Sequence, residues 1–282
     1  MAPLKVATKI AFVALAAYAV LTATAGAAVP TATDWTSHYR QSTVSLGVPD
    51  ATGSFVQQCT GVIVALRPQY GFIVTATHCI PPTSIRELRV RFAWNSEDDP
   101  GVILHLYDNA GRPTAQILDA GSDVAAVSLA HLDSVQLPVG VTLQGIGPSD
   151  FATPQDLYDG SEVFIYGFPG VPGTAARAIT RHGVVAWTDP KASWTRPFLV
   201  DAALLPGNSG GPVFRVQSGL TQSGAFEIGN HVVLMGIVSQ TYTTSMRSPV
   251  SPPHMIEVLT SIGQIRPISA IQSLVDKLTP KQ

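Results

Sequence analysis

The chain has 282 residues, of which 45% are hydrophobic and 13% charged, and its formal net charge is -2. This composition provides enough apolar residues for one large domain or two small ones and excludes a disordered chain. It contains no run of lysine or arginine, so nothing indicates nucleic acid as a partner. The 24 glycines and 22 prolines are scattered along the chain, which is typical of a loop-rich, mostly β protein.

The first 27 residues have the pattern of a secretory signal peptide. Lys5 and Lys9 precede the apolar run "IAFVALAAYAVL", and Ala25-Gly26-Ala27 fits a cleavage site between small residues. We therefore expect a secreted or periplasmic protein with a signal peptide over residues 1–27 and a short tether over residues 28–40. The alternative is an uncleaved anchor over residues 10–28, a length close to that of a bilayer span. A membrane is expected as a partner only in that case.

The chain has two cysteines, Cys59 and Cys79. In an exported protein such a pair predicts a disulfide, and the alternative is two buried free thiols. Two cysteines are too few for a structural zinc site of the usual kind. We expect no metal and no organic cofactor.

From about residue 41 the chain shows short runs of β-branched and aromatic residues with turn residues between them. One series covers 41–135 and a second covers 159–262, and a stretch richer in proline, glycine and aspartate predicts a linker over 136–158. This spacing is typical of a β-sandwich or β-barrel rather than of alternating strands and helices.

Helical spacing is visible only near the C-terminus, in residues 263–282. Pro267 suits the first turn of a helix, and the apolar residues that follow recur at helical spacing until Pro280. They are Ile268, Ile271, Leu274, Val275 and Leu278. We expect this helix to pack its apolar stripe on a barrel.

The segment "LLPGNSGGPVF", residues 204–214, contains the candidate nucleophile Ser209. A serine among glycines can simply be part of a tight turn, and a nucleophilic serine needs a base that is itself oriented by a third group. His78 in "IVTATHC" ends a strand-like run beside Cys79, which would hold the imidazole still. Asp123 in "SDVAAVSL" directly precedes an apolar run, whereas Asp119 lies further from it and is the weaker candidate.

Taken together, "TATHC", "SDVAAVSL" and "PGNSGGPVF" resemble the trypsin-like, chymotrypsin-fold serine proteases, in which histidine, aspartate and serine follow in this order. The resemblance covers roughly residues 41–278. It implies an all-β fold of two antiparallel β-barrels with a C-terminal α-helix, with His78 and Asp123 on the first barrel and Ser209 on the second. Ser209 would attack the peptide carbonyl, His78 would transfer the proton and Asp123 would orient His78. The oxyanion hole would be the backbone N–H groups of Gly207 and Ser209.

Two departures sharpen the resemblance. Asn208 stands where zymogen-type members have an aspartate that pairs with a newly cut N-terminus, so we expect no such activation switch. In this respect the chain is similar to the HtrA/Deg-like branch, but without a PDZ domain. For substrate binding, the resemblance assigns Ala203 to the base of the S1 pocket, Ser239 to support of the aspartate and Thr241 to the pocket wall. These residues predict a small or medium apolar residue at P1, the residue that donates the attacked carbonyl.

The sequence therefore predicts a serine endopeptidase that acts on protein or peptide substrates. A first alternative is a binding module that keeps the fold without turnover. A second is an esterase, because "GNSGG" also fits the G-x-S-x-G pattern, although a strand-like "PVF" follows where an esterase has a helix.

Overall fold

The computed structural model describes residues 32–278, except for 68–69, 97, 118–120, 136–138, 140–141, 171–176, 192–193, 221–225 and 248–254. The predicted signal peptide over 1–27 and the alternative aspartate, Asp119, lie outside the described residues. No helix within the described part is both long and apolar enough to cross a membrane.

Strands β1–β7 form a first unit, an antiparallel sheet in the order β5-β4-β1-β2-β3-β7-β6. They are β1 (Thr43–Pro49), β2 (Phe55–Arg67), β3 (Tyr70–Thr75), β4 (Glu87–Arg91), β5 (Val102–His105), β6 (Ala115–Ile117) and β7 (Ala125–Ser128). Short 3-10 turns follow β3 (η1, Thr77–Cys79) and β7 (η2, Leu129–His131). Among the described residues the strands β5 and β6 do not pair, so this unit is a half-barrel that is open between these two strands. The two end strands have only four and three residues, which limits the pairing available for closure.

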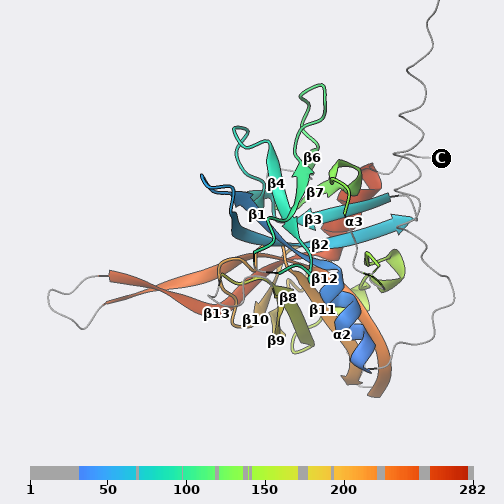
Figure 1. Ribbon diagram of the computed structural model, residues 1–282. Helices are drawn as coiled ribbons and strands as arrows, with labels where there is room; N and C mark the ends of the chain where they lie inside the picture. Colours follow the sequence, from blue (N-terminus) through green and yellow to red (C-terminus); the bar gives the residue numbers. More distant parts are fainter. Residues whose placement is uncertain are drawn as a thin grey trace, which may run out of the picture.

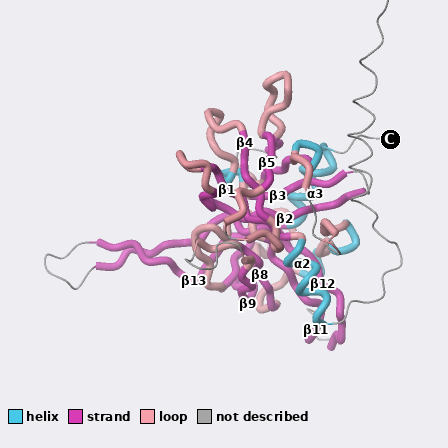
Figure 2. The backbone as a smooth tube through the Cα atoms, viewed as in Figure 1, coloured by secondary structure: helices cyan, strands magenta, loops and turns pink. Residues whose placement is uncertain are grey.

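Strands β8–β13 form a second unit, a closed antiparallel barrel in the order β10-β13-β12-β11-β8-β9. They are β8 (Glu162–Gly167), β9 (Ile179–Trp187), β10 (Phe198–Asp201), β11 (Pro212–Leu220), β12 (Phe226–Arg247) and β13 (Met255–Pro267). Figure 1 shows the two units one above the other, and Figure 2 shows how much of the described chain is strand. The all-β prediction is confirmed.

The first sheet is buried on both faces. Successive side chains of a strand point to opposite faces, and on β2 and β3 both sets are apolar. Val62 and Val74 join a core that is continuous with the barrel interior, whereas Ile63 and Ile73 join a second core on the other face. The large core therefore fixes the sheet to the barrel, and the candidate site lies where the two units meet.

Two α-helices complete the described part of the fold, and sequence reasoning anticipated one of them. The C-terminal helix α3 (Ile268–Leu278) buries its apolar stripe in the large core and contacts β7, β12 and β13. The second helix, α2 (Ala32–Gln41), lies where a tether was expected. Tyr39 explains its attachment: its ring lies 4.5 Å from that of Phe214, and its hydroxyl donates to the Val232 carbonyl at 3.1 Å.

The segment between the two units is packed against both of them. Ile146 bridges to Val64 of the first sheet, and Phe151 bridges to Leu234 of the barrel. Two 3-10 turns lie here, η3 (Pro148–Asp150) and η4 (Pro154–Asp156). Asp156 ends η4 in a buried ion pair, its carboxylate 2.7 Å from the Arg215 guanidinium of β11. The connection is thus bonded to the strand that follows Ser209.

Candidate active site

His78 lies in η1, directly after the end of β3, and a disulfide holds this turn in place. The predicted bond between Cys59 and Cys79 is confirmed: it joins β2 to η1, with 5.9 Å between the two Cα atoms. The His78 imidazole and both sulfurs lie within 4.8 Å of one another. Because the sulfurs are bonded to each other they are not thiolate ligands, so this cluster lacks the donors of a usual zinc site.

Asp123 approaches His78 from the start of β7. Its φ is 50°, the only positive φ at a non-glycine residue among those described, and aspartate tolerates this region better than most residues. In this conformation the carboxylate accepts from the His78 backbone N–H at 3.2 Å and lies 3.1 Å from the imidazole Nδ1. The Asp123 carboxylate therefore orients His78 through both its backbone N–H and its imidazole ring.

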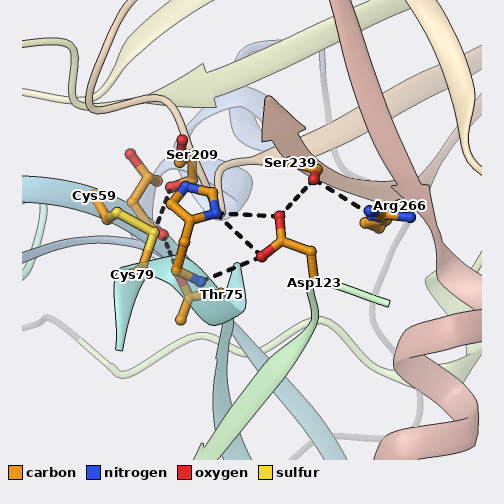
Figure 3. Close-up of polar contacts among 9 residues, drawn as sticks. Cys59, Thr75, Cys79, Asp123, Ser209, Ser239 and Arg266 are labelled. Atoms are coloured by element: carbon orange, nitrogen blue, oxygen red, sulfur yellow. Dashed lines mark hydrogen bonds and ion pairs between the residues drawn. A yellow bond between two sulfur atoms is a disulfide. The ribbon is translucent and has the colours of Figure 1, made fainter. Parts of the chain in front are cut away.

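Ser239 reaches the same carboxylate from the barrel. A β-bulge in β12 lies at this position, between Val238 and Gln240, and bulges re-aim side chains. The Ser239 hydroxyl donates to Asp123 Oδ2 at 2.5 Å, and Arg266 Nε of β13 donates to Ser239 Oγ at 3.3 Å. Figure 3 shows Ser239 between Asp123 and Arg266.

These contacts shift the pKa values of both partners toward the ion pair. Burial alone would raise the pKa of Asp123, but the hydrogen bonds from His78 and Ser239 outweigh it and the pKa is lowered. The hydrogen bond to Asp123 raises the pKa of His78, against the opposing effect of burial. Asp123 is thus an anion that stabilises a protonated His78.

Ser209 lies in the loop between β10 and β11, and this loop is docked on the first sheet. The Ser209 carbonyl accepts from Thr60 N–H at 2.8 Å and lies 3.7 Å from Cys79 Sγ. At the next residue, a Cβ added to Gly210 would lie 2.1 Å from both the Thr60 carbonyl and Thr75 Oγ1. Only glycine fits so close an approach, so the sequence "SGG" brings the serine within reach of the histidine turn.

The Ser209 hydroxyl makes no hydrogen bond with any described residue. The structure therefore joins His78 to Asp123 directly, and it brings Ser209 beside them through backbone contacts.

Gly207 has a φ of 95°, and a Cβ there would lie 2.4 Å from the Phe168 carbonyl. Thr60 fixes the loop further: its hydroxyl donates to the Gly207 carbonyl at 2.7 Å and accepts from Phe168 N–H at 2.9 Å. Within the described part of the chain, the N–H groups of Gly207 and Ser209 have no hydrogen-bond acceptor. Two backbone donors are thus available next to the Ser209 side chain.

Asn208 points away from this opening into the protein. Its residue is 1% exposed, and neither amide atom has a hydrogen-bond partner among the described residues. The amide lies against Gly167, at which a Cβ would be 3.3 Å from Asn208 Oδ1. No cation is bonded to this side chain in the described part of the chain.

Three features of the site agree with the protease architecture that the sequence motifs resemble. A carboxylate holds the histidine, the serine loop has two open N–H donors, and the loop belongs to a closed barrel. The family model that describes the trypsin-like peptidase domain matches residues 59–220. The chain belongs to this family. No curated protein matches the sequence. The match begins at the disulfide cysteine Cys59 and includes His78, Asp123 and Ser209.

In this trypsin-like peptidase, two of the candidate pocket residues, Ser239 and Thr241, lie on β12, and Ala203 lies in the loop after β10. Ala203 is exposed, while its neighbour Leu204 is buried. Leu204 Cδ1 lies 2.3 Å from the position that a Cβ on Gly263 would occupy, and Gly263 pairs with Thr241 across β12 and β13. The apolar Leu204 side chain therefore lies next to the Thr241 position, a contribution that sequence reasoning missed.

Sequence reasoning also missed Thr60, Thr75 and Arg266. Thr60 and Thr75 adjoin the motif residues in "CTG" and "TATHC", and Thr75 Oγ1 donates to the Thr60 carbonyl at 2.7 Å. Their positions within these motifs were a usable signal. No sequence signal pointed to Arg266, because it is the pairing of β12 with β13 that brings this residue to Ser239.

Proposed function

We propose that the protein is an exported serine endopeptidase that cleaves peptide bonds through Ser209, His78 and Asp123. The observation that carries the proposal is the Asp123 carboxylate, which accepts from the His78 backbone and the Ser239 hydroxyl while it contacts the His78 ring. A carboxylate bonded in this way fixes the imidazole and stabilises its protonated form, which is what proton transfer from a serine requires.

In the proposed mechanism, Ser209 Oγ attacks the carbonyl carbon of the scissile bond while His78 Nε2 takes the serine proton. The N–H groups of Gly207 and Ser209 donate to the oxygen as it becomes an anion, and each such donor contributes about 3 kcal/mol in comparable enzymes. His78 then gives the proton to the leaving amine. Water attacks the resulting ester by the same route, which releases the new carboxyl end and restores Ser209.

The disulfide supports export, because such bonds persist in oxidising compartments. The buried, uncharged Asn208 supports a protease without activation by an inserted N-terminus and a kinship with the HtrA/Deg-like branch. Leu204 beside Gly263 supports a small or medium apolar residue at P1. The competing hypothesis is a catalytically silent binding module of the same fold.

The test combines an active-site label with an unbiased peptide library. We expect a fluorophosphonate probe to label the wild type and not Ser209→Ala, and the library profile to be dominated by small or medium apolar P1 residues. A protein that binds peptides but neither labels nor cleaves would be the silent module. Cleavage dominated by arginine, lysine or glutamate at P1 would contradict the specificity, and activity lost on adding residues to the mature N-terminus would contradict the absence of a switch.

A further inference from the structure

The β12–β13 hairpin continues well beyond the barrel as a two-stranded ribbon. Thr243–Arg247 of β12 pairs with Met255–Leu259 of β13, and among the described residues neither segment pairs with any other strand. Figure 1 shows the ribbon projecting from the body of the molecule. Its outer edges therefore present unpaired backbone N–H and C=O groups, which natural proteins seldom leave uncovered.

The outer edge of β12 begins at the candidate active site. The last residue of β12 that pairs with β11 is Ile237. The next residue, Val238, exchanges two hydrogen bonds with the nucleophile loop: its N–H donates to Gly211 at 2.9 Å, and its carbonyl accepts from Gly210 at 2.7 Å. From Ser239 onward this edge is open, so the ribbon edge and the Ser209 loop are continuous.

The direction of the backbone groups on this edge follows from one contact. The Tyr242 carbonyl accepts from Thr260 Oγ1 at 2.9 Å and therefore faces β13. Backbone groups alternate between the two edges of a strand, and the irregularity in pairing here adds residues to β13 rather than to β12. The odd-numbered residues consequently face the open edge: they are Thr241, Thr243, Ser245 and Arg247.

The ribbon side chains are mostly uncharged and exposed. Tyr242, Met246, Met255 and Leu259 are 38%, 53%, 64% and 43% exposed. Thr243, Thr244 and Ser245 lie between them, and Arg247 and Glu257 are the charged residues in the paired part of the ribbon. Such a surface favours an uncharged, apolar polypeptide over an acidic or basic one.

We propose that the Thr243–Arg247 edge of the ribbon binds the substrate residues from P5 to P9, which precede the scissile bond, as an added antiparallel strand. The inference rests on the proposed function. With P1 beside Ser239 and P3 beside Thr241, the alternation places P5 beside Thr243, P7 beside Ser245 and P9 beside Arg247. The occupant is an extended, unfolded polypeptide segment of at least nine residues on this side, rich in apolar and β-branched residues, because strand addition requires an unpaired extended chain.

The first experiment measures kcat/KM for one peptide series that is identical from P2 onward past the scissile bond and begins at P3, P5, P7 or P9. We expect a gain of roughly three- to tenfold at each step, the range expected for one or two added hydrogen bonds. A methyl group on the backbone nitrogen at P5 or P7 should abolish the gain at that step. The same methyl group at P6 should leave it, because that nitrogen faces away from β12.

The second experiment introduces proline on one edge at a time. Thr243→Pro with Ser245→Pro removes two N–H groups from the edge that faces the substrate. The matched control is Glu257→Pro, which removes an N–H from the opposite edge, because Val258 pairs with Thr244 and faces inward. Proline is tolerated where a strand N–H is unpaired. We expect the double variant to cleave the P9 peptide no faster than the P3 peptide, and the control to retain the gain with length.

A ribbon shortened by replacing residues 244–258 with Asn-Gly provides a second test that does not depend on proline, and it should also lose the gain. Equal kcat/KM for all peptide lengths in a wild type that labels at Ser209 would overturn the ribbon proposal and leave the peptidase standing. A gain that survives in the shortened ribbon would overturn it too. No cleavage at any length, together with no label, would overturn the proposed function and the ribbon proposal with it.

Discussion

Arg266 Nε lies 3.3 Å from Ser239 Oγ, on the opposite side of that hydroxyl from Asp123 (Figure 3). An arginine N–H can only donate and a carboxylate can only accept. The Ser239 oxygen therefore accepts from Arg266, while its single proton is directed to Asp123 at 2.5 Å. Within the described part of the chain, Arg266 thus reaches the Asp123 carboxylate through Ser239, which makes it a candidate positioning residue.

This arrangement predicts non-additive effects. Ser239→Ala should lower kcat/KM roughly tenfold and Arg266→Met roughly threefold, since bonds to charged groups are stronger than neutral ones. The double variant should match Ser239→Ala, because among the residues that the structure describes Arg266 contacts Asp123 through Ser239. Arg266→Lys is the conservative control and should retain most of the activity. Losses that multiply in the double variant would show that Arg266 acts independently of Ser239.

The protonation of His78 should determine how kcat/KM falls at acidic pH. The hydrogen bond to Asp123 raises its pKa above the ordinary value of 6.5, and only the neutral imidazole accepts the serine proton. We therefore expect kcat/KM to rise with pH through a midpoint above 6.5. Asp123→Asn removes the groups that raise the pKa and leaves burial, so the midpoint should move to lower pH while kcat falls by about four orders of magnitude. A midpoint that does not move would mean that Asp123 does not set the pKa.

The motif residues and the all-β class could be predicted from the sequence because they depend on local features. Strand-length apolar runs predicted the two strand series but not every strand: the short β5 and β6 were not anticipated. Glycine-rich chemistry predicted the Ser209 turn, where φ values of 95° at Gly207 and 79° at Gly210 require glycine. Helix α2 was missed because its contact is non-local, through Tyr39 on Phe214. Arg266 was missed for the same reason, since a β-bulge and the register of β13 decide where it points.

Replacing Asn208 with aspartate should destabilise the fold in a pH-dependent way. Asn208→Asp would place a carboxyl at a residue that is 1% exposed and that has no cationic partner among the described residues. Burial raises the pKa of such a group above its unfolded value of about 3.9. The variant should therefore lose stability as pH rises above that value, by up to about 1.4 kcal/mol per pH unit.

Thermal melts at pH 4 and pH 8 check this effect, with Asn208→Ser as the uncharged control. The difference in Tm from wild type should widen at pH 8 only for the acidic variant. A Tm for Asn208→Asp equal to that of wild type at pH 8 would indicate that a cation, such as the mature N-terminus, does reach this site.

Removing the disulfide should lower both the stability of the fold and the activity. It closes a separation of 20 residues between Cys59 and Cys79, which corresponds to about 3 kcal/mol in the loop-entropy estimate. Cys59→Ala with Cys79→Ala should lower Tm by roughly ten degrees and reduce kcat, because η1 carries His78. Reducing agent should lower the Tm of the wild type and leave that of the double variant unchanged. Equal melting of both proteins without reductant would contradict a stabilising role.

The buried ion pair of Asp156 and Arg215 is expected to make a large contribution to the stability of the fold. Their side chains are 4% and 5% exposed, and Gln217 also donates to Asp156 at 2.7 Å. Asp156→Asn leaves the buried guanidinium without its counter-charge and should cost about 3–5 kcal/mol. Asp156→Leu with Arg215→Met removes both charges and should recover most of this loss. A double variant as unstable as Asp156→Asn would mean that packing, rather than the unpaired charge, sets the cost.

The contribution of Asp156 and Arg215 to the stability of the fold should depend on pH in a defined way. Burial raises the pKa of Asp156, but the bonds from Thr153, Gln217 and Arg215 outweigh it, so the folded pKa lies below the unfolded one. Its contribution to stability is then fully present above the unfolded value of about 3.9 and is lost as pH falls through the folded value. Denaturant unfolding between pH 2 and pH 6 should show a shallower acid loss in the Leu–Met double variant than in wild type. Parallel curves would contradict the lowered pKa of Asp156.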